Sequence, residues 1–212
     1  MSGNEASERE HVHYYEPRLG HGLPHDPFKA IVAPRPIGWI STISPAGAVN
    51  LAPYSFFNAF ASHPPVVGFC SEGYKDSVRN AEATGEFVCD LATRRHAEQM
   101  SLTSAPLAPD VNEFAHAGLT SAACRLVKPP RVADAPAALE CRVLQVIRLR
   151  DLEGRELDNY LTLGQVVAVH IHRACLVDGL FDITRAGTIA RCGYAADYAE
   201  VERLFQMTRP RG

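Results

Sequence analysis

The sequence predicts a mainly β protein: a barrel of about six to eight strands, with about two to four short helices at its ends. Two observations indicate this class. Short runs of β-branched and aromatic residues are broken by Gly, Pro, Asn and Asp about every ten residues, a spacing typical of sandwiches and barrels. Strand-like and helix-like runs do not alternate regularly, as they would in a doubly wound sheet.

The first half of the chain contains a hairpin and two buried strands. Ile37–Ile43 is rich in β-branched residues, Pro45–Gly47 is a turn signal, and Val49–Tyr54 resumes an extended run. This pattern predicts a hairpin. Short apolar runs at Val66–Cys70 and Phe87–Leu91 predict buried strands.

Helices are predicted around and after these strands. Asp76–Ala83 is typical of a short helix, with Asp76 or Ser77 as its cap and Gly85 as its stop signal. A second helix is predicted at Thr93–Leu102, and a weaker helical pattern follows at Val111–Ala117.

The second half of the chain is dominated by a long ribbon. Ala138–Arg150 and Leu161–Ala174 alternate their side chains over long stretches and are separated by a turn at Asp151–Gly154, which predicts two paired antiparallel strands. Apolar residues recur at helical spacing in Asp197–Met207, so we expect the chain to close with a helix.

Composition narrows the class further. The 212 residues are 46% hydrophobic and carry a net charge of −3 without a basic stripe, so we expect a folded protein with no nucleic-acid partner. The six cysteines form no CxxC pair, which argues against a zinc site and a disulfide framework. Residues 1–27 are polar and predict an N-terminal arm, and residues 28–212 predict one domain. Without an apolar leader or membrane-length segment we expect a cytoplasmic protein with no membrane partner.

Two segments carry residues suited to a binding site. Ala33–Phe60 sets hydroxyl and amide side chains among aromatic ones, the usual composition of a small-molecule pocket. A core hairpin whose hydroxyls bond to neighbouring backbone groups has the same composition, and composition alone favours it. Lys75 and Ser77 stand at the start of the predicted helix, where a phosphate could bind. Taken alone, helix capping beside a solvated lysine is the simpler interpretation.

The order of these segments resembles a known family. PRPIGWIST at 34–42, G-x-x-N-L-A-P-Y-S-F-F-N at 47–58, K-D-S at 75–77 and G-E-F-V at 85–88 are similar to the flavin reductase-like, FMN-binding split-barrel family, in its flavoprotein oxygenase-like branch. Later matches are Leu139-Glu140-Cys141, the strand from Gly164 to Ile171, and Arg191-x-Gly193-Tyr194. The resemblance covers about Phe28 to Tyr194.

The resemblance implies a split β-barrel with Greek-key topology and about six strands. It also implies a homodimer with FMN near the subunit interface. It assigns the flavin ring and ribityl chain to Ser41, Thr42, Ser55 and the backbone of Ala52, Pro53, Tyr54, Phe56 and Phe57, with Asn58 as a further anchor. It assigns the 5′-phosphate to Lys75 and Ser77, where the family more often has Thr at the second position. Arg191 and Tyr194 are expected to approach the flavin, from the same or the second subunit.

The chemistry that the resemblance implies is carried by the cofactor. Flavin accepts a hydride at N5, with NADH or NADPH as the expected reductant, so we nominate no catalytic acid, base or nucleophile. An oxygenase acting on an organic substrate and a flavin-binding module without turnover remain alternatives. His170 and His172 share a strand face like a metal-ligand pair, but no third ligand lies near them in the sequence, so we predict no metal site.

Overall fold

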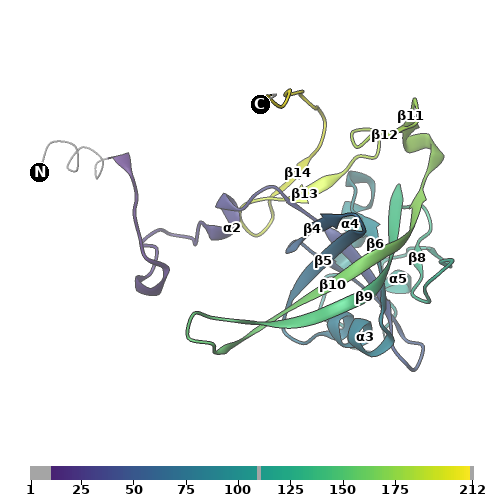
Figure 1. Ribbon diagram of the computed structural model, residues 1–212, viewed down its shortest axis with the longest axis horizontal. Helices are drawn as coiled ribbons and strands as arrows, with labels where there is room; N and C mark the ends of the chain where they lie inside the picture. The colour runs from purple at the N-terminus through teal and green to yellow at the C-terminus, as the bar shows by residue number, and fades with distance from the viewer. Residues whose placement is uncertain (1–10, 109–110, 211–212) are drawn as a thin grey trace, which may run out of the picture.

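The computed structural model describes residues 11–108 and 111–210, and within them seven strands form one antiparallel sheet (Figure 1). The strand order is β3-β2-β6-β9-β10-β5-β4. Strands β3 and β5 also contact each other, so the sheet curls round into a barrel. The strands of this sheet are β2 (Gly38–Ile43), β3 (Val49–Tyr54), β4 (Phe57–Ser62), β5 (Pro65–Glu72), β6 (Glu86–Leu91), β9 (Ala137–Arg150) and β10 (Glu156–Ile171).

Shorter elements lie around the barrel, and residues 11–27 extend away from it (Figure 1). No helix in the described part of the chain is both long and apolar enough to cross a membrane. The short strands pair as β1–β13–β14, β7–β8 and β11–β12, with the bounds β1 (Arg35–Pro36), β7 (Ser121–Ala122), β8 (Arg131–Val132), β11 (Leu176–Val177), β12 (Leu180–Phe181), β13 (Ile189–Arg191) and β14 (Tyr198–Glu200). The helices are η1 (Pro17–Leu19), α2 (Phe28–Ile31), α3 (Asp76–Thr84), η2 (Arg94–His96), α4 (Ala97–Leu102), α5 (Glu113–His116) and η3 (Arg173–Cys175).

The predicted hairpin is confirmed as β2 and β3. Its turn is closed by the Ser44 hydroxyl, which accepts a hydrogen bond of 3.0 Å from the backbone N–H of Ala48. Gly47 has φ 90°, a conformation that favours glycine. Pro53 is tolerated because β3 is an edge strand of the sheet, and backbone groups along its outer edge have no hydrogen-bonding neighbour strand.

Two cores cover opposite faces of β2. Ile40 packs inside the barrel with Phe69 and Phe87, whose rings meet edge to face at 5.4 Å. Trp39 points the other way, and its indole N–H donates a hydrogen bond of 2.9 Å to the hydroxyl of Thr103. Because both faces are buried, the polar residues Ser41 and Thr42 of this strand are buried along with its apolar ones.

The long ribbon is confirmed as β9 and β10, but β10 begins five residues earlier than predicted, at Glu156. The Glu156 carboxylate pairs with Arg148 at 2.5 Å and with Arg150 at 2.7 Å. These cross-strand ion pairs hold the ends of the ribbon together where the sequence suggested a looser stretch.

Two local predictions are wrong. Asp197–Met207 is not a helix: Tyr198–Glu200 forms β14, and Leu204 and Phe205 are exposed, so the helical pattern has no core to pack against. Instead, the edge of β13 provides backbone partners for this segment.

The predicted stop of α3 at Gly85 is confirmed, because Gly85 has φ 74° and its N–H bonds to the carbonyl of Ala81.

The other wrong prediction concerns the cap of α3. Neither Asp76 nor Ser77 caps this helix. Its N-cap is Lys75, and no side chain accepts a hydrogen bond there. The Asp76 carboxylate pairs with Arg79 instead.

Candidate functional site

A cavity of about 360 Å³ lies between β3 and the start of α3. Its wall includes Asn50, Pro53 and Tyr54 from β3, and Lys75 and Ser77 from the start of α3. Its size falls in the range of small-molecule sites. The two segments that the sequence singled out therefore line one cavity.

A hydrogen-bond network fixes this wall. The side-chain amide of Asn50 donates to the Ser77 hydroxyl at 2.8 Å and to the Thr42 hydroxyl at 3.4 Å. Asn80, one turn further along α3, donates to Thr42 at 3.3 Å. Because all four side chains are at least nine-tenths buried, these bonds fix the position of α3 relative to the hairpin.

The start of α3 suits an anion. The first-turn N–H groups of a helix have no partner within the helix, and its dipole is positive at this end. No side chain caps them here, and Lys75 is exposed beside them. The negative charge of Asp76 repels an anion less than a free carboxylate would, because it is paired with Arg79.

Glu113 and Tyr54 are the titratable groups in the cavity wall with shifted pKa values. Burial raises the pKa of Glu113, whose carboxylate accepts a hydrogen bond of 3.1 Å from the N–H of Leu51. Burial also raises the pKa of Tyr54, and the hydroxyls of Ser77 and Ser71 act in the opposite direction. Burial of the Glu113 carboxyl therefore acts against its charged form.

Two further cavities continue from the first. One, of about 540 Å³, shares Pro53 and Ser104 with it and is lined by Ser55, Arg191 and Tyr194. The other, of about 490 Å³, shares Ser55 with this second cavity. The three cavities therefore form a connected surface along the end of the hairpin.

The predicted site residues divide among these cavities. Ala52, Pro53, Tyr54, Lys75 and Ser77 line the first cavity, Pro53, Ser55, Arg191 and Tyr194 line the second, and Ser55, Phe56, Phe57 and Asn58 line the third.

Ser41 and Thr42 line none of the three cavities. Both are fully buried, and Thr42 bonds to the amides of Asn50 and Asn80 behind the cavity wall.

Some lining residues were not predicted. Glu113 and the segment Thr103–Leu107 reach the first cavity from the far side. Arg35 and Tyr198 join the second cavity, where the guanidinium of Arg191 lies 4.7 Å from the centre of the Tyr198 ring. No spacing in the sequence signals these residues, because tertiary packing alone brings them to the site.

A curled antiparallel barrel, with a cavity between its first hairpin and an uncapped helix start, defines a β-barrel protein that binds a small molecule. The chain belongs to the family of the flavin reductase like domain, whose model matches residues 32–185. The predicted split-barrel class is confirmed by the architecture and by this membership.

Known proteins resemble the chain over most of its length. An uncharacterized protein of Halalkalibacterium halodurans is 33% identical over 185 residues, which cover 84% of this chain and 87% of that one. The crystal structure of nitrilotriacetate monooxygenase component B from Bacillus cereus superposes with a TM-score of 0.80 at 27% identity, covering 85% and 90% of the two chains. A putative flavin reductase with a split barrel domain from Shewanella frigidimarina gives 0.77 at 21% identity, covering 86% and 90%.

Proposed function

We propose that this protein is an FMN-binding oxidoreductase of the flavin reductase type, which moves a hydride from NADH or NADPH through flavin N5. The observation that carries the proposal is the hydrogen bond from Asn50 to Ser77, which joins the hairpin to the helix start around one cavity. Family membership supports the flavin-related oxidoreductase class.

The start of α3 fits the phosphate of FMN. Lys75 supplies a positive charge, and the uncapped first turn supplies backbone N–H donors. The Ser77 hydroxyl accepts a bond from Asn50, and its proton can donate to a phosphate oxygen when it turns away from the Tyr54 hydroxyl. Three kinds of donor therefore converge on one position.

The end of the hairpin fits the ring. The N–H groups of Ser55 and Phe56 lie outside both strand ladders, between β3 and β4. They are available to donate hydrogen bonds to the polar edge of the ring. When bound, the flavin supplies hydride acceptance at N5. The protein holds the ring and leaves one face open, and we assign the buried Thr42 to support of Asn50.

The second cavity favours an anionic organic substrate as the alternative. Lys29, Arg35 and Arg191 line it, against one carboxylate from Asp26. The Bacillus cereus relative is named as a component of a nitrilotriacetate monooxygenase, and nitrilotriacetate is a carboxylate anion. An oxygenase or another FMN-dependent oxidoreductase acting on an organic acid is therefore the second candidate function.

A steady-state assay separates these functions. Purified protein is mixed with NADH or NADPH, with and without added FMN, and nicotinamide oxidation is followed by absorbance. Oxidation that depends on FMN alone supports the reductase. Oxidation that requires an added organic acid supports the oxygenase, and flavin binding with neither reaction supports a flavin-binding module and overturns the enzyme proposal.

We also propose that the chain acts as a homodimer. Strand β4 is an edge of the sheet, and Phe60 on it is 55% exposed beside the third cavity. An open apolar edge of this kind is typical of an interaction surface. Light scattering at FMN saturation should give twice the mass of one chain, and a monomer that still binds FMN would rule out a site shared between subunits.

A further inference from the structure

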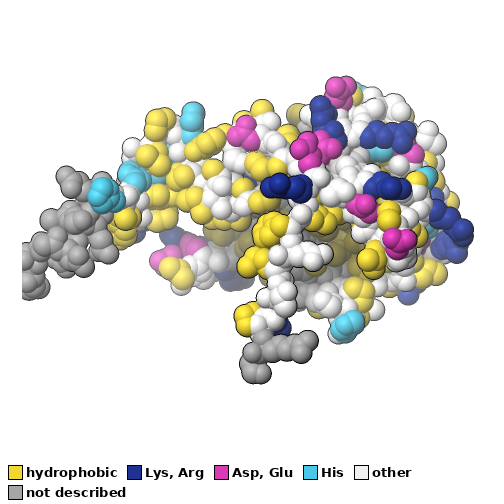
Figure 2. Space-filling model, turned by 90° about the horizontal axis from the view of Figure 1, so that it is seen from above, with side chains coloured by type: hydrophobic (Ala, Val, Ile, Leu, Met, Phe, Trp, Pro, Cys, Tyr) yellow, Lys and Arg dark blue, Asp and Glu magenta, His cyan; other side chains and the backbone are white. Residues whose placement is uncertain are grey.

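A separate basic cavity lies at the other end of the ribbon from the start of α3. It has a volume of about 420 Å³ and is bounded by the segment 125–135 and the last residues of β10. Four of its lining side chains are basic and none is acidic: Arg125, Arg131, His170 and His172. Figure 2 shows Lys and Arg side chains, with Asp and Glu side chains among them, at the end of the molecule that carries β8 and β11 in Figure 1.

The two arginines keep free hydrogen-bond donors. Within residues 11–108 and 111–210, the guanidinium of Arg125 makes no hydrogen bond or ion pair. Arg131 donates through Nη1 to the carbonyls of Val132 and Ala133, at 3.3 and 2.9 Å, and its buried Nε has no partner among the described residues. Both side chains are therefore able to bind a further acceptor.

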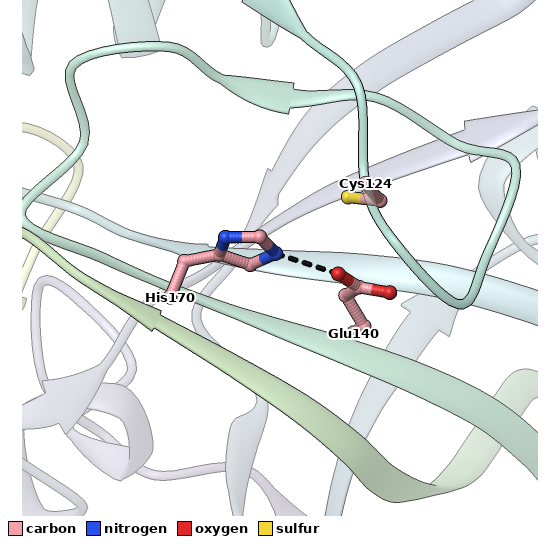
Figure 3. A group of neighbouring side chains, drawn as sticks. All are labelled: Cys124, Glu140 and His170. Carbon is pink, nitrogen blue, oxygen red and sulfur yellow. Dashed lines mark hydrogen bonds and ion pairs between the residues drawn. The ribbon is translucent and has the colours of Figure 1, made fainter.

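The carboxylate of Glu140 forms no ion pair with either arginine in the described part of the chain. Glu140 is fully buried, and its two oxygens accept bonds from the backbone N–H groups of Arg125, Leu126 and Val127, at 2.9, 2.6 and 3.1 Å. A fourth bond of 2.6 Å comes from His170 (Figure 3). These four donors occupy the acceptor positions of the carboxylate, so Glu140 holds the loop rather than the arginines.

Asp134, the other acid on this segment, is directed elsewhere. Its carboxylate pairs with Arg95 at 3.0 Å and with His96 at 3.2 Å. The buried Asp90 behind the segment accepts a bond of 3.0 Å from the N–H of Val132. Burial raises the pKa of Asp90 well above the usual range, and the charge of Arg131 acts in the opposite direction. The cavity therefore has an excess of positive charge.

A metal ion fits this place less well. Ligand atoms of Cys124, Glu140 and His170 lie within 4.8 Å of one another, a group that includes His170 but not His172 of the pair considered in the sequence (Figure 3). The carboxylate is already saturated by N–H donors, however, and burial raises the pKa of Cys124 to about 12, so its thiol stays protonated. A cation would have to displace the N–H donors from the Glu140 carboxylate and the proton from the Cys124 thiol.

We propose that this cavity binds a phosphate group, either as the free ion or as a phosphate monoester, through Arg125 and Arg131 with His170 and His172 at its rim. Planar guanidinium groups present paired donors that match phosphate oxygens. Ala133, Ala135 and Ala168 also line the cavity, so an organic moiety of a monoester would lie against their small apolar side chains. The inference does not depend on flavin binding.

Calorimetric titration tests the proposal on protein carrying one equivalent of FMN, in phosphate-free buffer at low salt. The probes are inorganic phosphate, phenyl phosphate and phenol. We expect saturable binding of at least one phosphate probe and none of phenol. Tighter binding of phenyl phosphate assigns the site to a monoester, and equal binding of both assigns it to the free ion.

Two variants locate the binding. Arg125→Ala should weaken it about tenfold or more, the loss typical of a charge-assisted hydrogen bond. Lys128→Ala, three residues away and outside the cavity lining, should leave it unchanged. Absence of binding by both phosphates, or equal affinity in the two variants, would overturn the proposal. Zn²⁺ binding that Cys124→Ser abolishes, without phosphate binding, would also overturn it and assign a metal site.

Discussion

The side-chain amide of Asn50 donates a hydrogen bond of 2.8 Å to the hydroxyl of Ser77, and so connects the edge strand of the barrel to the first turn of α3. These residues are 27 positions apart in the sequence. The bond orients the Ser77 hydroxyl toward use as a donor, and it places the backbone N–H groups of the helix start beside the hairpin. Under the proposed function, stability and cofactor binding depend on the same contact.

Asn50→Ala should lower both stability and FMN affinity. The substitution leaves the buried hydroxyl of Ser77 without its donor and leaves Thr42 with only the bond from Asn80, which costs about 1 to 3 kcal/mol of unfolding free energy. Urea unfolding and a fluorescence titration with FMN measure the two effects. Asn58→Ala is the matched control for stability, because its exposed amide bonds only to the next backbone N–H, and it should change stability by less than about 0.5 kcal/mol. Equal unfolding free energies for the two variants would contradict the account.

Gly164→Ala should destabilise the barrel core. A Cβ at this position would lie 2.6 Å from Cζ of the fully buried Phe87 ring and 3.2 Å from Cβ of Cys141. Overpacking of this kind costs about 1 to 3 kcal/mol. Urea unfolding of Gly164→Ala, Phe87→Leu and the double variant tests the contact. The double variant should be more stable than the sum of the two losses implies, because the smaller side chain makes room, whereas additive losses would show that the two positions do not interact.

Glu140→Gln should remove a pH-dependent contribution to stability. Burial acts to raise the pKa of Glu140, but hydrogen bonds from the Arg125 N–H, from His170 and from the Leu126 N–H lower it more, so the net pKa is below the usual value. A carboxylate with a lowered folded-state pKa stabilises the fold above its unfolded pKa of about 4.3, and this contribution is lost as pH falls through the folded-state pKa.

At pH near 7 the Gln variant should therefore unfold more easily by about 1 to 3 kcal/mol, because its NH₂ group faces N–H donors. The difference from the native protein should narrow below pH of about 4. Urea unfolding at several pH values measures it, with the exposed Glu153→Gln as control. A difference that widens with acidification would have the wrong sign for this account.

The sequence alone predicted most of the barrel. The hairpin, α3 and the long ribbon have strong local signals: β-branched runs, a glycine in the left-handed region at Gly85, and long alternation. The closing helix failed because its apolar spacing was not matched by burial: Phe205 is 82% exposed. Periodicity states which face could be buried, but only the tertiary fold supplies a surface to bury it against.

The site was predictable only in part. The residues from Ala52 to Ser55 and the pair Lys75 and Ser77 could be proposed because short motifs carry them. The positions of Glu113, of Arg35 and of Glu140 beside His170 could not be predicted, since each depends on contacts between distant segments. The same family resemblance assigned Ser41 and Thr42 to the flavin along with the lining residues, yet their side chains are fully buried, which the motif at 34–42 does not reveal.

Comparing FMN with riboflavin on Lys75→Ala is the most direct test of the central claim, that the start of α3 holds the flavin phosphate. The two flavins differ only in the phosphate, so fluorescence titrations of the native protein, Lys75→Ala and the control Lys128→Ala isolate its contribution. The account predicts that Lys75→Ala weakens FMN by about 1.5 to 3 kcal/mol and riboflavin far less, with no change in the control. Equal losses for the two flavins, or a native protein that takes up no FMN, would contradict it.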